Sequence, residues 1–245
     1  MARDHTPVAV VTGGGSGIGK ALCAVLAREG WSVAVADRDA AAAETVAREV
    51  GGFAHSVDVA DETSVGALFA AVAAKFGRLD GLATSAGVVD TTPFADISVA
   101  TFERVHAVNV IGTFLCIREA AKKMQRGGRM CTVASVAGKR GGGLSGTAAY
   151  AASKGAVLAL SRSAARSLAA QGITVNCVAP GATLTPMLAE RFNDLEHRRR
   201  VEGMTLLGRS AEPAEIAEAI AWLLSPRSSF VAGETLTIDG GLMLD

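Results

Sequence analysis

The chain's only tyrosine stands four residues before a lysine, in the sequence Tyr150-Ala-Ala-Ser-Lys154. In a helix this spacing places the phenol and the ammonium on the same face. An unperturbed phenol has a pKa of about 10, but a neighbouring cation favours the phenolate and lowers that pKa. The pair therefore predicts a tyrosine that serves as a general acid or base. Because a bare Tyr-x-x-x-Lys also arises by chance, its chemistry depends on the other motifs of the chain.

A glycine-rich turn, Thr12 to Ala21, follows the first apolar run and opens a helical segment. Glycines let the backbone approach a phosphate closely, and the free N–H groups at a helix start attract it. From Gly14 the spacing matches a P-loop until Ala21, which stands where that motif needs a Ser or Thr for Mg²⁺, so a P-loop NTPase is disfavoured. The turn instead predicts a dinucleotide-binding loop. Its expected cofactor contacts are Gly13, Gly15, Ser16, Gly17, Ile18 and Gly19.

A carboxylate closes the second apolar run, because Asp37 stands 18 residues after Gly19. A carboxylate at such a position accepts hydrogen bonds from an adenosine ribose 2′-OH and repels a 2′-phosphate, so we expect NAD rather than NADP. The adjacent Arg38 keeps NADP as an alternative, since its guanidinium can turn toward a phosphate.

These motifs and several others follow one another from Thr12 to Gly241, and together they resemble the short-chain dehydrogenase/reductase family. The resemblance covers nearly the whole chain. Its motifs are the glycine turn at 12–19, Asp37, Asp58-Val59, Ser85-Ala86-Gly87, Asn109, Ser135, Tyr150-x-x-x-Lys154, Pro180-Gly181 and Thr237-Ile-Asp-Gly-Gly241.

The resemblance implies a role for each of four catalytic residues. Ser135 resembles the serine that polarises the substrate oxygen, as an oxyanion donor does. Tyr150 is similar to the base that exchanges a proton with that oxygen. Lys154 resembles the lysine that lowers the tyrosine pKa and binds the nicotinamide ribose. Asn109 resembles the asparagine that holds a water between this lysine and bulk solvent.

The resemblance also implies further cofactor contacts. Asp58 and Val59 match the pair beside the adenine, and Thr185 matches the hydroxyl near the nicotinamide carboxamide. The other expected contacts are Ser85, Ala86, Gly87, Pro180, Gly181 and Thr183.

Two departures from the family pattern qualify this assignment. Ser85 stands where the family usually has asparagine, and a serine offers fewer donors to the neighbouring backbone. The interval between Ser135 and Tyr150 is slightly long, with the extra length in Gly141–Gly143, so Ser145 is a rival for the catalytic serine. We prefer Ser135, because it follows a predicted strand and leads into Val-Ala-Gly as the family's serine does.

The elements that must position these residues follow from an alternation of short β-branched runs and longer Ala-rich segments of helical period. This pattern predicts an α/β protein with a doubly wound, seven-stranded parallel sheet of Rossmann type and helices on both faces. The predicted strands are 8–11, 32–36, 53–57, 80–84, 129–134, 173–178 and 235–238. The predicted helices are 17–29, 39–49, 62–76, 99–125, 150–170 and 212–225.

We expect residues 1–245 to form a single domain, because no linker, charge block or repeat divides them. Two stretches fit the alternation poorly: the glycine-laden 136–147 and the segment 180–211. Ligands bind outside the carboxyl ends of parallel strands, so these stretches predict the walls of a site, with a substrate lid near 183–211. The expected substrate walls are Val88, Val89, Asp90, Gly141–Leu144, Met187, Leu188, Phe192 and Met204.

Composition excludes several function classes. Equal numbers of basic and acidic residues, 24 of each, disfavour a nucleic-acid or anionic-membrane partner. Four widely spaced cysteines suggest neither a disulfide framework nor a zinc site, so no metal is expected. No uninterrupted apolar run is long enough to span a membrane, and the cytoplasm is the expected location. The family resemblance implies a homo-oligomer, commonly a tetramer, built through the helices at 99–125 and 150–170.

The sequence thus predicts an NAD(H)-dependent oxidoreductase that interconverts a small secondary alcohol and a ketone. One alternative is a 3-oxoacyl-thioester reductase, for which the basic residues Lys122, Lys123, Arg126 and Arg129 could dock an acidic acyl carrier protein and His197–Arg200 could grip a phosphate. Such runs are also typical of a solvated helix face or helix end. Another alternative is a regulatory protein that binds NAD without catalysis, against which the intact Ser135, Tyr150 and Lys154 speak.

Overall fold

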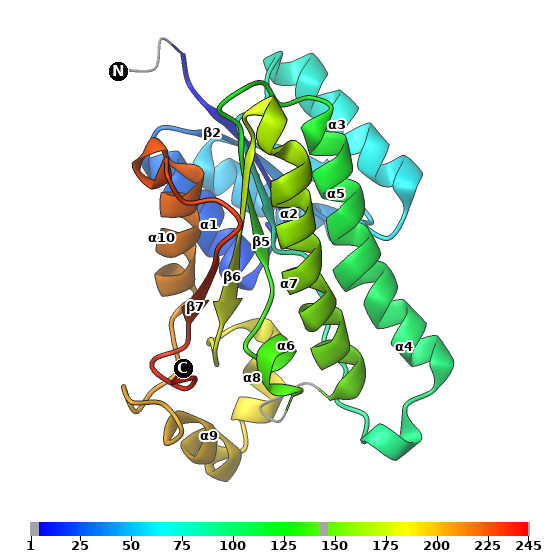
Figure 1. The fold of residues 1–245 in the computed structure, drawn as a ribbon, viewed down its shortest axis with the longest axis vertical. Helices are drawn as coiled ribbons and strands as arrows, with labels where there is room; N and C mark the ends of the chain where they lie inside the picture. Colours follow the sequence, from blue (N-terminus) through cyan, green and yellow to red (C-terminus); the bar gives the residue numbers. More distant parts are fainter. Residues whose placement is uncertain (1–4, 143–146, 245) are drawn as a thin grey trace.

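The structure, a computed structural model, describes residues 5–142 and 147–244. Its centre is a single seven-stranded sheet in which every pair of neighbouring strands is parallel, with the order β3-β2-β1-β4-β5-β6-β7 (Figure 1). The predicted doubly wound parallel sheet is therefore confirmed. Its strands are β1 (Val8–Thr12), β2 (Ser32–Asp37), β3 (Phe53–Ser56), β4 (Gly81–Thr84), β5 (Arg129–Val133), β6 (Thr174–Pro180) and β7 (Thr235–Ile238).

The central strands are mostly apolar and are buried along most of their length, because helices cover both faces of the sheet. In β1, for example, all five residues are buried. One core cluster packs the sheet against α1 (Gly17–Arg28), α2 (Ala40–Val50) and α10 (Pro213–Leu224). The other packs it against α3 (Glu62–Phe76), α5 (Gly112–Ala121) and α7 (Ala148–Leu168). The sheet is thus the middle layer of three (Figure 1).

The long helix predicted at 99–125 is interrupted and ends earlier than expected. It consists of α4 (Val99–His106), a π-helical segment (Ala107–Ile111) and α5, which ends at Ala121. The wide π turn contains Asn109, which is only 1 % exposed and makes side-chain hydrogen bonds to neighbouring segments. Such single π turns are frequent at functional sites. The apolar period of the segment predicts one continuous helix and carries no sign of this wide turn.

Three short helices were not predicted: α6 (Ala137–Arg140), α8 (Pro186–Phe192) and α9 (Leu195–Glu202). Each is too short to show a clear helical period. Local residues nevertheless favour them, since Pro186 opens α8 and the Asp194 carboxylate accepts from the backbone N–H groups of Glu196 and His197 at the start of α9. All three gather beyond the carboxyl ends of the strands, on the side where the C-terminus lies (Figure 1).

The four cysteines are all buried and unpaired, as small apolar residues in the core. Burial raises the pKa of the Cys23 and Cys116 thiols to about 12. Among the described residues, no helix is long and apolar enough to cross a membrane.

Candidate active site

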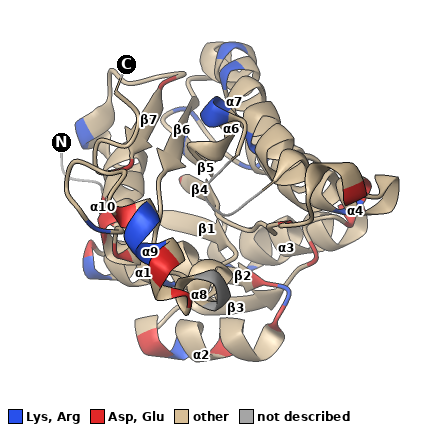
Figure 2. Ribbon diagram, turned by 90° about the horizontal axis from the view of Figure 1, so that it is seen from below, with Lys and Arg blue, Asp and Glu red and all other residues tan. Residues whose placement is uncertain are grey.

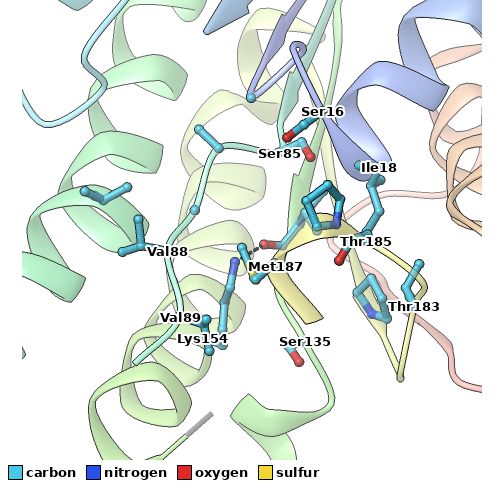
Figure 3. Close-up of a pocket in the computed structure, with 18 of the residues that line it drawn as sticks. Ser16, Ile18, Ser85, Val88, Val89, Ser135, Lys154, Thr183, Thr185 and Met187 are labelled. Carbon is cyan, nitrogen blue, oxygen red and sulfur yellow. Dashed lines mark hydrogen bonds between the residues drawn. The ribbon is translucent and has the colours of Figure 1, made fainter. Parts of the chain in front are cut away.

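A cavity of about 290 Å³ opens at the carboxyl end of the sheet. It is lined by residues from the ends of β1, β2, β4, β5 and β6, from the first turns of α1 and α8, and from α7. Figure 3 shows Val88 and Val89 on one side of the cavity and Thr183 and Thr185 on the other. This is the edge at which an open parallel sheet binds ligands.

The glycine turn brings its backbone close to the cavity, and at Gly13 and Gly19 there is no room for a Cβ atom. Gly13 has a φ of +68°, and a Cβ there would lie 2.6 Å from the backbone nitrogen of Ala86. At Gly19 a Cβ would lie 2.0 Å from the carbonyl oxygen of Gly13, so α1 can pack closely against the turn only with glycine. Four predicted contacts line the cavity, namely Gly13, Ser16, Gly17 and Ile18.

Two of the predicted glycine contacts do not line the cavity. Gly19 lies behind the turn, against Gly13. Gly15 faces Asp37, whose Oδ2 accepts a hydrogen bond from the Gly15 N–H at 2.9 Å, while Oδ1 accepts from the Asp39 N–H at 3.0 Å. In the structure both glycines contact other parts of the protein, and their assignment as cofactor contacts stays a prediction. Asp37 and Arg38 do line the cavity, as predicted, and so do Asp58 and Val59.

Three of the four predicted catalytic side chains meet at the other end of the cavity. Ser135 follows β5, and its hydroxyl accepts from the Ala137 N–H at 3.1 Å. Tyr150 and Lys154 lie one turn apart in α7, with the Lys154 Nζ 5.7 Å from the centre of the Tyr150 ring. Lys154 Nζ also donates to the Val133 carbonyl at 2.8 Å. All three residues line the cavity.

Burial dominates the ionisation of this cluster. It raises the pKa of the Tyr150 phenol above its ordinary value, and the hydrogen bond with the Ser135 hydroxyl opposes that rise. It lowers the pKa of the Lys154 ammonium to about 8. The sequence predicted that Lys154 lowers the pKa of Tyr150. In the protein without cofactor, burial instead raises the pKa of Tyr150, because desolvation disfavours the charged forms of both side chains.

Asn109 does not line the cavity; it lies behind the wall and positions it. Its Oδ1 accepts from the Val88 N–H at 2.8 Å, and its Nδ2 donates to the Val88 carbonyl and to the Ser153 hydroxyl, both at 2.9 Å. Ser153 in turn donates to the Tyr150 carbonyl at 2.7 Å. One amide therefore ties the loop after β4 to the α7 backbone at Tyr150.

The remaining predicted cofactor residues line the cavity: Ser85, Ala86, Gly87, Pro180, Gly181, Thr183 and Thr185. The Ser85 N–H donates to the Thr12 carbonyl at 3.1 Å, which joins β4 to β1 beside the glycine turn. Thr185 lies close to the turn as well, since a Cβ at Gly17 would be 3.2 Å from its Cγ2. The rival serine, Ser145, lies outside the described residues.

The expected substrate walls are partly correct. Val88, Val89, Met187 and Leu188 line the cavity. The lining does not include Asp90, Gly141, Gly142, Phe192 or Met204: Phe192, for example, packs into a small cluster with Val136, Ala182 and Val201. Gly143 and Leu144 lie outside the described residues. Further lining residues were not predicted, and all are neighbours of motif residues in the chain or the fold: Val57, Val108, Val133, Ala134, Ala137, Ala182 and Pro186.

The cavity as a whole fits a dinucleotide. The glycine turn has no side chains at Gly13 and Gly17, which leaves space there. It lies between the Asp37 carboxylate at the end of β2 and the cluster of Ser135, Tyr150 and Lys154. Among the described residues there is no group of His, Cys, Asp and Glu arranged to hold a metal ion.

Comparison with known proteins agrees with this geometry. A family model described as enoyl-(acyl carrier protein) reductase matches residues 13–243. The chain is 41% identical over 239 residues to 2,5-dichloro-2,5-cyclohexadiene-1,4-diol dehydrogenase of Sphingobium indicum, with 95% of each chain covered. It is 36% identical to cyclopentanol dehydrogenase of Comamonas sp., with 98% of each covered.

A solved structure of a short-chain dehydrogenase/reductase from Brucella melitensis, described as glucose/ribitol dehydrogenase, superposes with a TM-score of 0.93 at 31% identity over 100% of both chains. Fold, motif order and relatives agree with the resemblance drawn from the motifs. The chain belongs to the short-chain dehydrogenase/reductase family of oxidoreductases.

Proposed function

We propose that the protein is an NAD(H)-dependent oxidoreductase that interconverts a secondary alcohol and a ketone, with Tyr150 as the general acid/base. The observation that carries this proposal is the convergence of Ser135, Tyr150 and Lys154 on one cavity that also reaches the glycine turn and Asp37. A proton-transfer group and a dinucleotide site thus share one space.

The proposed chemistry divides between cofactor and protein. A bound NAD⁺ would supply the acceptor for the hydride that leaves the alcohol carbon. The Ser135 hydroxyl donates a hydrogen bond to the substrate oxygen, and the Tyr150 phenolate takes the hydroxyl proton as the ketone forms; in reduction Tyr150 returns it. Lys154 binds the nicotinamide ribose and stabilises the phenolate. Asn109 fixes the Val88 backbone and, through Ser153, the α7 backbone at Tyr150.

The position of Asp37 supports NAD over NADP. The carboxylate lines the cavity at the end of β2 and is held by the backbone N–H groups of Gly15 and Asp39. A 2′-phosphate placed beside it would meet a fixed negative charge. Arg38 also lines the cavity, so weaker NADP use is compatible with the proposal.

The walls near Tyr150 support an uncharged alicyclic alcohol as substrate. Val88, Val89, Met187 and Leu188 supply an apolar surface there. The relatives include enzymes named for cyclopentanol and for a cyclohexadiene diol. The segment 183–211, which contains α8 and α9, is the proposed lid over this substrate.

A 3-oxoacyl-thioester reductase is the second candidate, favoured by the acyl-carrier description of the matching family model. Two observations weaken it. Asp37 disfavours the NADPH that biosynthetic reductases of this family generally use. The basic residues considered for carrier docking lie at the opposite edge of the sheet, where β5 begins at Arg129, and Lys122 is paired with Glu119 at 2.7 Å.

Replacing Tyr150 with Phe tests the catalytic assignment. We expect the Tyr150→Phe variant to bind NADH as the wild type does and to lose at least about 100-fold in kcat, in line with the usual contribution of general acid–base catalysis. Cofactor binding is read from quenching of tryptophan fluorescence and turnover from NADH absorbance. Unchanged turnover in this variant contradicts the assignment.

The wild type tests cofactor and substrate class in the same assays. NADH is expected to bind more tightly than NADPH, and tighter NADPH binding would overturn the role given to Asp37. A panel of cyclopentanol, cyclohexanol, 2-butanol, a sugar alcohol and 3-hydroxybutyryl-CoA is expected to give its fastest turnover with a cyclic alcohol. NADH binding without turnover of any member would favour the regulatory alternative, and turnover of the thioester alone would favour the acyl reductase.

A further inference from the structure

A buried carboxylate, Asp90, lies beside the start of the catalytic helix and takes no part in the cavity lining. Its residue is only 7 % exposed. It ends the short segment Gly87–Asp90 that follows β4, and Val88 and Val89 of that segment line the cavity. Burying a carboxylate is costly unless hydrogen bonds satisfy it, so its partners indicate what it does.

The partners of Asp90 tie it to the residue that begins α7. Thr147 is the N-cap of α7, and its N–H donates to the Asp90 carbonyl at 3.0 Å. The Thr147 hydroxyl lies within hydrogen-bond distance of two Asp90 oxygens, 3.1 Å from the carboxylate Oδ2 and 3.3 Å from the backbone carbonyl oxygen. It makes no capping bond to its own helix. Thr92 holds the carboxylate from the other side, with its hydroxyl 2.9 Å from Oδ1.

A second connection also joins the loop after β4 to α7. It runs from Val88 through Asn109 and Ser153 to the Tyr150 carbonyl. Together the two connections hold α7 at its N-cap and at Tyr150, three residues later. The carboxylate also lies at the helix N-terminus, where a negative charge is favourable.

We propose that Asp90 is a positioning residue for Tyr150: through Thr147 it sets the place of the first turn of α7, and hence of the phenol, relative to the Val88–Val89 wall. The inference rests on the proposed role of Tyr150. It follows from geometry, because the segment that lines the substrate space and the helix that carries the phenol are joined at this carboxylate. Misplacement of a catalytic group by about 1 Å can cost roughly 100-fold in rate.

The test compares substitutions at both ends of the contact, with cyclopentanol and NAD⁺ as the probes. Asp90→Ala and Thr147→Val are each expected to lower kcat about 10- to 100-fold, with the Kd for NADH changed less than about twofold. Asp90→Asn is expected to stay within about threefold of wild type, because its amide oxygen still accepts from Thr147 and its NH₂ can donate to the Thr92 hydroxyl. Thr147→Ser keeps the hydroxyl and is expected to rescue kcat likewise.

Because the two residues act through one contact, the double variant Asp90→Ala/Thr147→Val is expected to be little slower than the slower single variant. Asp96→Ala, at an exposed carboxylate of the same loop region, is the matched control and keeps wild-type kcat. A kcat within twofold of wild type for Asp90→Ala, multiplicative losses in the double variant, or a parallel loss of NADH binding and thermal stability each overturn the proposal.

Measuring Tyr150→Phe beside these variants separates the two proposals. An active Tyr150→Phe contradicts the catalytic role of the phenol itself. An inactive Tyr150→Phe together with a fully active Asp90→Ala contradicts only the positioning role.

Discussion

Tyr150 lies in a buried position that disfavours its phenolate form when no cofactor is bound. Burial raises the pKa of the phenol, and the Lys154 ammonium, whose own pKa burial lowers to about 8, donates to a backbone carbonyl instead. The proposed mechanism needs a phenolate near neutral pH. The positive charge that NAD⁺ brings beside the phenol is the additional influence that would lower its pKa.

Because the chain has one tyrosine, phenolate absorbance reports on Tyr150 alone. In the cofactor-free protein we expect burial to keep the pKa of the phenol above that of an ordinary tyrosine. With NAD⁺ bound we expect the midpoint to fall, because a positive charge at close range favours the phenolate. The measurement is a pH titration followed in the near ultraviolet, with NADH, which lacks the ring charge, as the control. Equal midpoints with NAD⁺ and with no cofactor would count against Tyr150 as the base.

Most residues that meet at the site could be predicted from the sequence, because the spacing of the motifs is tied to local structure. The glycine turn, Asp37, Ser135, Tyr150 and Lys154 are each tied to local geometry that a linear pattern encodes. Contacts that act across the fold leave no such trace: the side-chain bonds of Asn109 to Val88 and Ser153 do not follow from its place in the sequence, and its water-holding role stays a prediction. Asp90 was placed in the substrate wall, although its carboxylate turns to Thr147.

At the scale of the element, α1 can pack against the glycine turn only because Gly13 and Gly19 have no Cβ atom. Gly19→Ala would set a Cβ 2.0 Å from the Gly13 carbonyl oxygen, in backbone that has no room to give. We expect this variant to lose about 1–3 kcal/mol of unfolding free energy, as overpacked sites do, and at least tenfold in NADH affinity. Urea denaturation and fluorescence titration measure the two effects.

The matched control is Gly66→Ala, in the middle of α3. A Cβ there would have no neighbour within 4 Å, so the change only removes the helical cost of glycine. We expect it to raise the unfolding free energy by about 0.5–1 kcal/mol. If both variants lost stability equally, the close approach of α1 to the turn would not be the cause.

The strands and most long helices were predicted within about two residues because period and glycine ends mark them. Helix α3 matches its predicted range throughout, closed by Gly77 with a φ of +70°. The short helices α6, α8 and α9 were not predicted, because four to eight residues are too few to show a helical period. The stretches in which they lie were nonetheless identified as irregular and as walls of the site.

At the scale of the whole molecule, α4 and α5 leave apolar side chains in solvent. We define the α4–α5 stripe as Val99, Phe102, Ile111 and Phe114, of which Val99 is 73 %, Ile111 50 % and Phe114 44 % exposed. Grouped exposed apolar residues of this kind mark interaction surfaces. They lie within the segment 99–125, through which the family resemblance implies that a homo-oligomer is built.

We therefore expect the protein to assemble through this stripe and charged substitutions there to split the assembly. Ile111→Glu and Phe114→Glu place a carboxylate in the expected contact, so the mass measured by light scattering should fall to that of a smaller species. Leu195→Glu, at an exposed apolar residue of α9, should leave the mass unchanged. A monomeric wild type, or variants that keep its full mass, would contradict this expectation.

The position of β4 beside β1 has a consequence for synthesis of the chain. The first two β-α units place β2 and β3 on one side of β1, while the other edge of β1 must await residues 81–84. Until these emerge from the ribosome, the nascent chain carries an open apolar strand edge, which is a template for wrong pairing. The cavity spans segments from Gly13 to Leu188, so the growing chain acquires its dinucleotide site only after most of it has been made. The proposed cofactor would therefore stabilise only the finished sheet, and it cannot cover this strand edge while the chain is being made.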